Sequence, residues 1–431
     1  MRLALLILQI AHGPYAVGFK SLALWDHTRT LGSGPRPLQV SIWYPAIPSA
    51  NAQRMRVREY AWLTTVPGRL PRDGAAAHAA GERALLSIYS TPDTARWRRA
   101  LDAVTLAVGN ATPAPGHFPV VVYGPGRDGV SFDNSVLMED LASHGYLVIA
   151  SPSWGPAGPM PSGFDGLECE ARDMEFLLAY ARRLPTADTT RTAVMGYSWG
   201  GMSDILVAMR NASIDAVVTL DGSIGYWYER RFKGGPFVDP DRLGVPVLFL
   251  KQAHPGDLTS YGADSVFAFF PEIRYADAYL VPLPARHQNF SSLRNALDVD
   301  DSSAAYPRMA QYALAFLDAE LKGSREGAAL VASVATERRV GKKPRPTVAD
   351  FARAAHSRGL ASAPDILAEI RANDPDYRLP EDEVDTWAEE LWQDGRRADA
   401  TGVLRLNVAM YPNSTNAVDR LRAVEDSVEH R

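Results

Sequence analysis

Residues 192–201 read TAVMGYSWGG, and this stretch decides the fold of the chain. Its first four residues have the character of a buried strand, and residues 202–209 continue with a helical pattern. Between them, GYSWG (196–200) matches G-x-S-x-G, the sequence of a sharp strand-to-helix turn. Such a turn strains the backbone at the serine, and flanking glycines remove the clash that larger side chains would cause. We therefore expect Ser198 at a strand end, where a helix N-terminus favours developing negative charge.

The sequence on both sides of this turn alternates between strand and helix patterns, which is typical of a parallel sheet flanked by helices. The predicted strands are 119–123, 146–150, 192–195, 216–220, 245–250 and 278–281, and the predicted helices are 133–144, 166–184, 202–209 and 303–321. Before them, residues 20–25 and 38–44 predict antiparallel strands. The sequence thus predicts an α/β domain with a mostly parallel sheet, antiparallel N-terminal strands and helices on both faces.

The remaining segments divide the chain further. Residues 14–341 are predicted as the α/β domain, with scattered Pro, Gly, Ala and Arg at 46–116 indicating an insertion that lies over it. A basic, proline-containing linker follows at 342–346. Beyond it, residues 346–431 have helical patterns throughout and predict a small all-α domain.

Residues 1–13 resemble a short export signal, with Arg2 followed by an apolar run. The alternative is a buried N-terminal strand or helix. An export signal favours a secreted or periplasmic protein, whereas the alternative is compatible with the cytoplasm. No segment of the sequence is apolar for long enough to predict a membrane-spanning helix.

Composition limits the function classes. The 431 residues carry a formal charge of −5, with no basic excess of the kind that nucleic acid or an anionic membrane requires. The single cysteine, Cys169, excludes an intrachain disulfide and a cysteine-based metal site. Asp298, Asp300 and Asp301 lack the ligand spacing and glycine of a calcium loop, so we expect neither a metal nor a cofactor.

A serine at such a turn needs a base and an orienting acid, which follow in the order Ser, acid, His in folds with this motif. His287 follows the last predicted strand and is the favoured base, with His254 as its rival. Asp221 follows strand 216–220, and Asp257 follows the next strand. The spacing alone does not choose between these two acids.

The segment GPGRDG (124–129) also matches G-x-G-x-x-G, which would indicate a dinucleotide-binding enzyme. That motif expects an acidic residue at the end of the second strand, but the strand at 146–150 continues as Ser-Pro-Ser. Pro125 also removes an N–H group that a phosphate would use. The pattern therefore disfavours nucleotide binding.

Four segments resemble the platelet-activating-factor acetylhydrolase-like and dienelactone-hydrolase-like α/β hydrolases. They are VSIWYP (40–45), DLASHGY (140–146), GYSWG (196–200) and HQNF (287–290). The resemblance covers roughly residues 18–321 and implies the α/β-hydrolase fold. It further implies hydrolysis of a small-molecule or lipid-like carboxylic ester through an acyl-enzyme.

The resemblance also implies roles for particular residues. Ser198 would be the nucleophile and His287 the base, and the Leu-Asp context of this group selects Asp221 over Asp257 as the acid. The oxyanion would bind the backbone N–H groups of Trp199 and Arg127. The loop that holds Arg127 departs from the group's pattern, because Arg-Asp replaces Leu-Gly there. A lactonase, a peptidase and a catalytically silent binding protein are the alternatives on this scaffold.

Two further segments have patterns that suggest a role. Residues 226–228 and Phe232 are aromatic, and they either line an acyl or leaving-group pocket or pack as an ordinary loop. Residues 383–414 resemble a tetratricopeptide unit, with a helix, a Gly-Arg turn and a second helix. About one and a half units are visible, which favours packing on another domain, contact with a protein or self-association.

Overall fold

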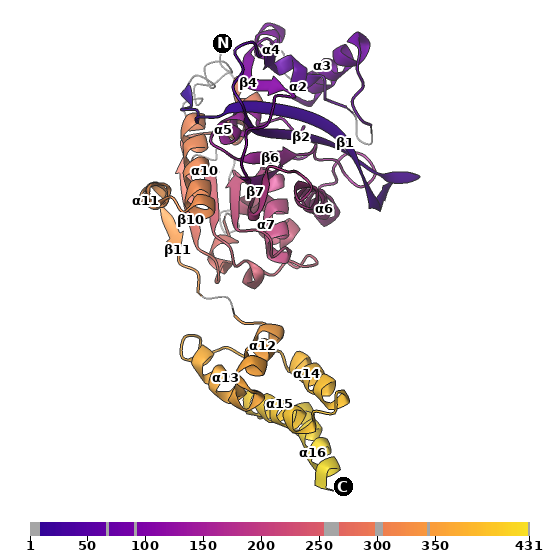
Figure 1. Ribbon diagram of the computed structural model, residues 1–431, viewed down its shortest axis with the longest axis vertical. Coiled ribbons are helices and arrows are strands. Elements are labelled where there is room, and N and C mark those ends of the chain that lie inside the picture. Colours follow the sequence, from indigo (N-terminus) through magenta and orange to yellow (C-terminus); the bar gives the residue numbers. More distant parts are fainter. Residues whose placement is uncertain are drawn as a thin grey trace. The chain divides into compact units, whose positions relative to one another are not determined.

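The computed structural model describes residues 9–65, 69–89, 93–253, 267–297, 305–342 and 345–429. The chain divides into two compact units, Met1–Lys342 and Lys343–Arg431, whose elements are labelled in Figure 1. Residues 1–8 of the predicted export signal lie outside the described part, as do Asp298, Asp300 and Asp301. His254 and Asp257 also lie outside it.

The first unit is built on one sheet. In the described residues its strands follow the order β11-β10-β9-β8-β7-β5-β6-β2-β1-β4-β3. The strands are β1 (Ala16–Leu31), β2 (Gly34–Ala46), β3 (Arg54–Arg56), β4 (Val104–Gly109), β5 (Phe118–Gly124), β6 (Leu147–Ala150), β7 (Ala187–Tyr197), β8 (Ala216–Leu220), β9 (Val247–Gln252), β10 (Ala278–Leu283) and β11 (Glu337–Arg339). Strands β5 to β10 pair in parallel, whereas β1 and β2 form an antiparallel pair that joins β6. This arrangement confirms the predicted fold class.

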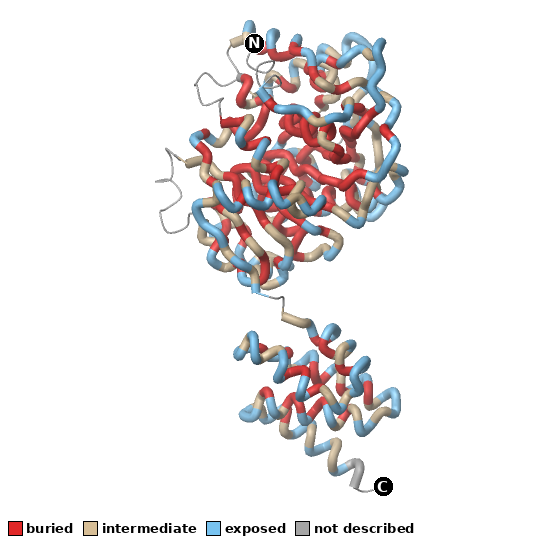
Figure 2. The backbone as a smooth tube through the Cα atoms, turned by 60° about the vertical axis from the view of Figure 1, so that its left-hand side comes forward, coloured by how far each residue is buried: buried red, intermediate tan, exposed pale blue. Residues whose placement is uncertain are grey.

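The central strands are apolar on both faces because helices cover both. Along β5, Val121 and Tyr123 face one core with α5 and α10, and Val120 and Val122 face the other with α6 and α7. Figure 2 shows many buried residues, in red, in the interior of the first unit. The helices are α5 (Ser135–Ser143), α6 (Phe164–Ala181), α7 (Gly200–Arg210), α8 (Ile224–Trp227), α9 (Ser292–Leu297), α10 (Ala305–Lys322) and α11 (Arg325–Val334).

The segment predicted as an insertion, 46–116, extends the sheet. Its strand β4 pairs in parallel with β1, and β3 pairs with β4. The helices α2 (Val57–Ala61), α3 (Ala75–Tyr89) and α4 (Thr94–Leu101) lie between these two strands in the sequence. Trp97 and Leu101 of this segment join the core that contains Tyr123, so the segment belongs to the packed body of the first unit.

The second unit is helical. It contains α12 (Val348–Arg358), α13 (Ala363–Arg371), α14 (Glu381–Gln393), α15 (Arg397–Met410) and α16 (Thr415–Glu429). These helices share an apolar core of their own. Gly395 lies between α14 and α15 with a φ of 79°, a backbone conformation that favours glycine and explains the Gly-Arg turn. The tetratricopeptide resemblance of this segment stays a prediction.

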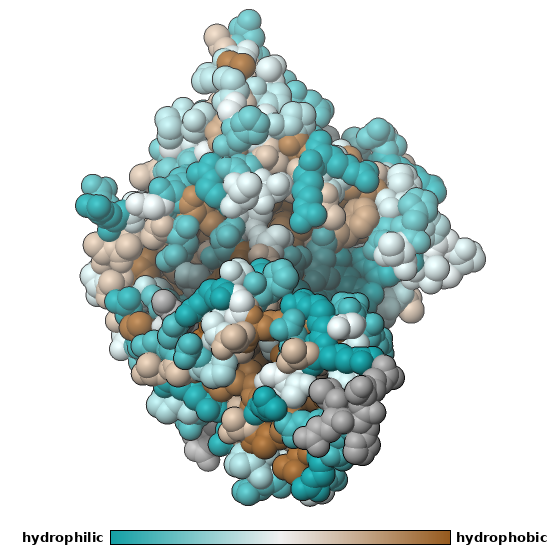
Figure 3. All heavy atoms as spheres, turned by 60° about the horizontal axis from the view of Figure 1, so that its bottom comes forward, coloured by the Kyte–Doolittle hydropathy of each residue, from teal (hydrophilic) through white to brown (hydrophobic). Residues whose placement is uncertain are grey.

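Figure 3 shows hydrophilic residues interspersed with smaller apolar areas over one face of the chain. In the part of the chain that the structure describes, no helix combines the length and the apolar character that crossing a membrane requires.

Candidate active site

The turn between β7 and α7 holds Ser198 in a left-handed conformation, with a φ of 55°. Glycine is required on both sides of it. A Cβ atom on Gly196 would lie 2.2 Å from the carbonyl carbon of Gly200, and one on Gly200 would lie 2.1 Å from the carbonyl oxygen of Gly124. The close approach of three backbone segments therefore explains the G-x-S-x-G pattern and presents the serine at the end of its strand.

Strand register brings the predicted site residues to one edge of the sheet. Gly124 of β5 pairs with Gly196 of β7, and Tyr197 pairs with Leu220 of β8. Because neighbouring parallel strands end together, the residues that follow them, among them Ser198 and Asp221, leave the sheet side by side.

His287 joins these two residues in one chain of hydrogen bonds. Its Nε2 atom lies 2.8 Å from Ser198 Oγ, and its Nδ1 atom lies 2.6 Å from Asp221 Oδ2. A carboxylate can only accept a hydrogen bond, so Nδ1 carries the proton and the neutral Nε2 can accept from the serine hydroxyl. The Asp221 side chain is fully buried, whereas 39% of the His287 side chain is exposed. A substrate can therefore reach the imidazole but not the carboxylate.

The second carboxylate oxygen of Asp221 is also occupied. Oδ1 accepts a hydrogen bond from the Tyr226 hydroxyl at 2.7 Å and another from the backbone N–H of Gln252 at 2.9 Å. The backbone N–H of Asp221 donates to Leu250 at 2.7 Å. Together with His287, three donors thus converge on one buried carboxylate.

Tyr197, the residue before Ser198, supports the imidazole. Its ring stacks on that of His287 with centroids 5.0 Å apart and an interplanar angle of 24°. Its hydroxyl donates to the His287 carbonyl oxygen at 3.2 Å. The sequence pattern gave no signal for this role, because this position of the motif accepts any residue.

The loop after β5 passes directly against the serine. A Cβ atom on Gly126 would lie 3.2 Å from the Tyr197 ring and 3.4 Å from the Ser198 Cβ atom, so the loop is in close contact with the serine turn at the residue before Arg127. The loop is a tight turn in which the Gly129 N–H donates to the Gly126 carbonyl at 2.6 Å. Asp128 fixes its outer side by accepting from the Met160 N–H at 2.7 Å.

The two predicted oxyanion donors belong to different segments near Ser198. Trp199 precedes the first residue of α7, and Arg127 lies in the loop with its side chain half exposed. Among the described residues, neither backbone N–H group has a hydrogen-bond acceptor. An oxyanion requires two such donors, and the assignment of this role to Trp199 and Arg127 stays a prediction.

Asp133 follows this loop in the chain and contacts the residues that come after His287. The sequence pattern does not single it out. Its carboxyl accepts from the Tyr123 hydroxyl at 2.7 Å, and its backbone carbonyl accepts from the Ser291 hydroxyl and the Leu293 N–H. Burial raises the pKa of the Asp133 carboxyl to about 7. Its position just after the Gly-rich loop was the one available signal.

The aromatic segment after Asp221 divides into two parts. Tyr226 contacts the acid, whereas Tyr228 and Phe232 pack in the core against Phe269. Within the described ranges, no three His, Cys, Asp or Glu side chains are grouped so that they could hold a metal ion.

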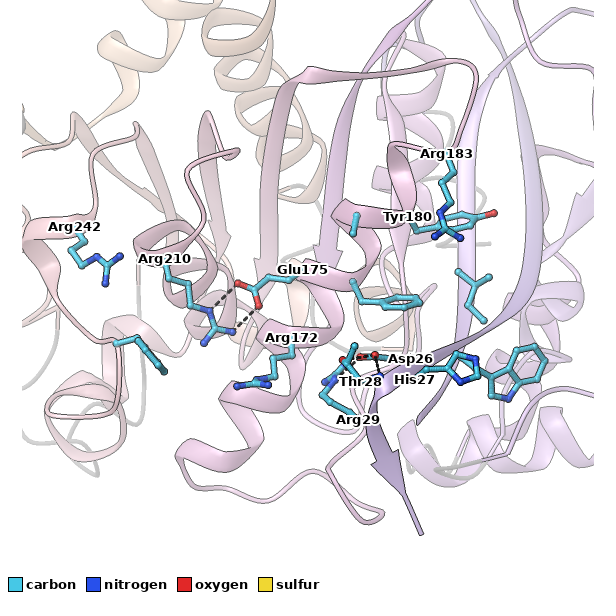
Figure 4. A pocket seen from close by; sticks show the side chains of 15 residues that line it. Asp26, His27, Thr28, Arg29, Arg172, Glu175, Tyr180, Arg183, Arg210 and Arg242 are labelled. Atoms are coloured by element: carbon cyan, nitrogen blue, oxygen red, sulfur yellow. Dashed lines mark hydrogen bonds and ion pairs between the residues drawn. The ribbon is translucent and has the colours of Figure 1, made fainter. Parts of the chain in front are cut away.

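A groove of about 850 Å³ runs along α6, away from these residues (Figure 4). Ion pairs lie along it, with Arg210 bound to Glu175 at 2.9 Å and Arg29 bound to Asp26 at 2.6 Å. None of the residues predicted from the sequence for the active site lines this groove.

Comparison with models of protein families gives no match, and comparison with curated proteins gives none either. Among solved structures, the chain is similar to a ferulic acid esterase from Streptomyces cinnamoneus, with a TM-score of 0.51 and 22% sequence identity. The similarity covers 72% of this chain and 91% of that chain. The two proteins therefore share the α/β-hydrolase fold.

Proposed function

We propose that this chain is a serine hydrolase that cleaves carboxylic esters through an acyl-enzyme. The observation that carries the proposal is the continuous hydrogen-bonded chain from Ser198 through His287 to Asp221, with the serine in a strained left-handed turn. The similarity to a ferulic acid esterase supports an ester as the substrate. The alternative acid, Asp257, lies outside the described residues.

The proposed reaction begins when His287 takes the proton of Ser198 as the serine oxygen attacks the ester carbonyl. Asp221 holds the imidazole in the required tautomer and stabilises the imidazolium that forms. The N–H groups of Trp199 and Arg127 bind the oxyanion, and each contributes about 3 kcal/mol to transition-state stability. His287 returns the proton to the leaving alcohol.

The second half of the reaction repeats these steps with water. His287 takes a proton from a water molecule, which attacks the acyl-enzyme, and Ser198 then leaves with the proton. Apart from the ester and water, both halves use only groups of the protein. All residues in this scheme belong to the first unit.

Hydrolysis of p-nitrophenyl esters from acetate to octanoate, and of methyl ferulate, tests this proposal. We expect turnover by the unmodified protein and a loss of at least about 10⁴-fold in Ser198→Ala. Ser213→Ala is the matched control, because Ser213 lies beyond the other end of α7 and its hydroxyl donates to Asn211.

Labelling with a fluorophosphonate separates the alternatives. Labelling of Ser198 without turnover of any ester would favour a lactonase or a peptidase on the same residues. If folded protein were neither labelled nor active, the proposal would fail and a binding scaffold would replace it.

A further inference from the structure

The hydroxyl of Tyr226 has no part in the proposed reaction, yet it contacts the acid of the hydrogen-bonded chain. Its oxygen lies 2.7 Å from Asp221 Oδ1, and the tyrosine is 5% exposed. Tyr226 belongs to α8, a single helical turn that begins three residues after Asp221. Its ring packs edge-on against Phe267, with centroids 5.7 Å apart, so the surrounding residues fix where the hydroxyl points.

Asp221 depends on such a partner because its own backbone does not fix its side chain. Its φ of 45° places it in the left-handed region, where a residue with a Cβ atom is strained. It follows β8 directly and precedes a glycine, so no regular element continues through it. External donors must therefore set the direction of its carboxylate.

The two carboxylate oxygens have different partners. Oδ2 faces His287, whereas Oδ1 is held from two elements, by Tyr226 of α8 and by the N–H of Gln252 at the end of β9. With Oδ1 held, rotation of the carboxylate would break two hydrogen bonds. The two hydrogen bonds to Oδ1 therefore keep Oδ2 directed at the imidazole of His287.

We propose that Tyr226 is a positioning residue for the acid, and that it sets how strongly Asp221 acts on His287. This inference rests on the proposed function. The tyrosine hydroxyl draws charge toward Oδ1, and it holds the carboxylate in place while the charge on His287 changes during the reaction.

Tyr226→Phe removes the hydroxyl and keeps the ring. Tyr228→Phe is the matched control, since Tyr228 is also buried, follows two residues later and donates its hydroxyl to Glu272 instead. We expect kcat to fall about tenfold in Tyr226→Phe with KM nearly unchanged, because a hydrogen bond to a charged group is lost. In Tyr228→Phe we expect kcat within about twofold of the unmodified protein, as its hydroxyl lies outside the site.

The pH dependence of kcat/KM distinguishes positioning from general packing. Without the tyrosine donor, more charge remains on Asp221 to stabilise the imidazolium, so the acid limb should move to higher pH in Tyr226→Phe and stay in place in Tyr228→Phe. Equal kcat values and an unmoved acid limb in both variants would overturn the inference.

A measurement that needs no turnover separates this inference from the proposed function. The proton between His287 Nδ1 and Asp221 should give a low-field ¹H NMR signal in the unmodified protein. A change of that signal in Tyr226→Phe alone supports the positioning role even if every ester fails as a substrate. An identical signal in both variants contradicts the role even if esters are cleaved.

Discussion

Two buried places near α7 hold carboxyl groups, one at the strand end and one between α6 and α7, and they differ in how these groups are hydrogen-bonded. At the strand end, Asp221 has three donors for its two oxygens. Between α6 and α7, Glu170 accepts from the Ser203 hydroxyl at 2.9 Å, and neither oxygen of Asp204 makes a well-formed hydrogen bond. Burial raises the pKa of Glu170 to about 8 and that of Asp204 well above its usual range.

The comparison shows that burial by itself does not produce a charged group that can act on a histidine. A carboxyl without enough donors keeps its proton, because the interior cannot replace the water that stabilised its charge. A carboxyl with converging donors can be buried as a carboxylate. Only the strand-end carboxyl has those donors, and only there does a histidine face the acid.

The largest expected effect comes from Asp221→Asn. The amide oxygen would accept from Tyr226 and Gln252, so the NH2 group would face His287 Nδ1 and favour the wrong imidazole tautomer. We expect kcat to fall about 10⁴-fold. Asp204→Asn is the control within the comparison and should stay within a few-fold of the unmodified activity, because Asp204 has no part in the hydrogen-bonded chain of Ser198, His287 and Asp221. Ester turnover in both variants checks this, and an equal loss in both would remove the distinction.

Glu170→Gln should change how stability depends on pH. In the unfolded chain Glu170 ionises near pH 4.5, whereas in the folded chain its pKa is about 8. The folded state then binds more protons, so this residue lowers the free energy of unfolding as pH rises between these values. The loss amounts to roughly 3 to 5 kcal/mol by pH 8.

The glutamine cannot ionise, so Glu170→Gln should lose less stability than the unmodified protein between pH 5 and pH 8. Urea unfolding at both pH values measures the difference. Glu175→Gln, on the same helix but ion-paired with Arg210 at 2.9 Å, should not reproduce it. An equal change in the free energy of unfolding between the two pH values, in Glu170→Gln and in the unmodified protein, would contradict the prediction.

Ser203→Ala should increase, by a smaller amount, the loss of stability with rising pH that Glu170 causes. Its hydroxyl is a donor to Glu170 and lowers the pKa of that carboxyl, in opposition to burial. Its loss should reduce stability at pH 9 by about 1 kcal/mol more than at pH 5. The same urea measurement applies, and an equal loss at both pH values would show that the hydroxyl contributes packing alone.

Tyr197→Phe should give the smallest effect. The ring that stacks on His287 remains, and only the 3.2 Å hydrogen bond to the His287 carbonyl is lost. We expect kcat to fall about two- to fivefold, because one hydrogen bond between neutral groups contributes little. A loss as large as that of Asp221→Asn would place the tyrosine hydroxyl in the reaction itself.

The sequence by itself determined the α/β fold class with its mostly parallel sheet, because the alternation of apolar strands and amphipathic helices is a local pattern. It also identified Ser198, since the strained turn needs glycines at fixed positions in one short stretch. His287 followed from its place after the last predicted strand. These features depend on neighbours in the chain and can be read without the structure.

Only the tertiary structure decided which side chains meet. Spacing could not choose between Asp221 and Asp257, and the structure places Asp221 on His287 at 2.6 Å. The sequence pattern did not specify the contact of Tyr226 with Asp221, that of Asp133 with Tyr123, or the joining of β4 to the sheet. They arise from strand register and from packing between segments far apart in the chain, which local pattern does not specify.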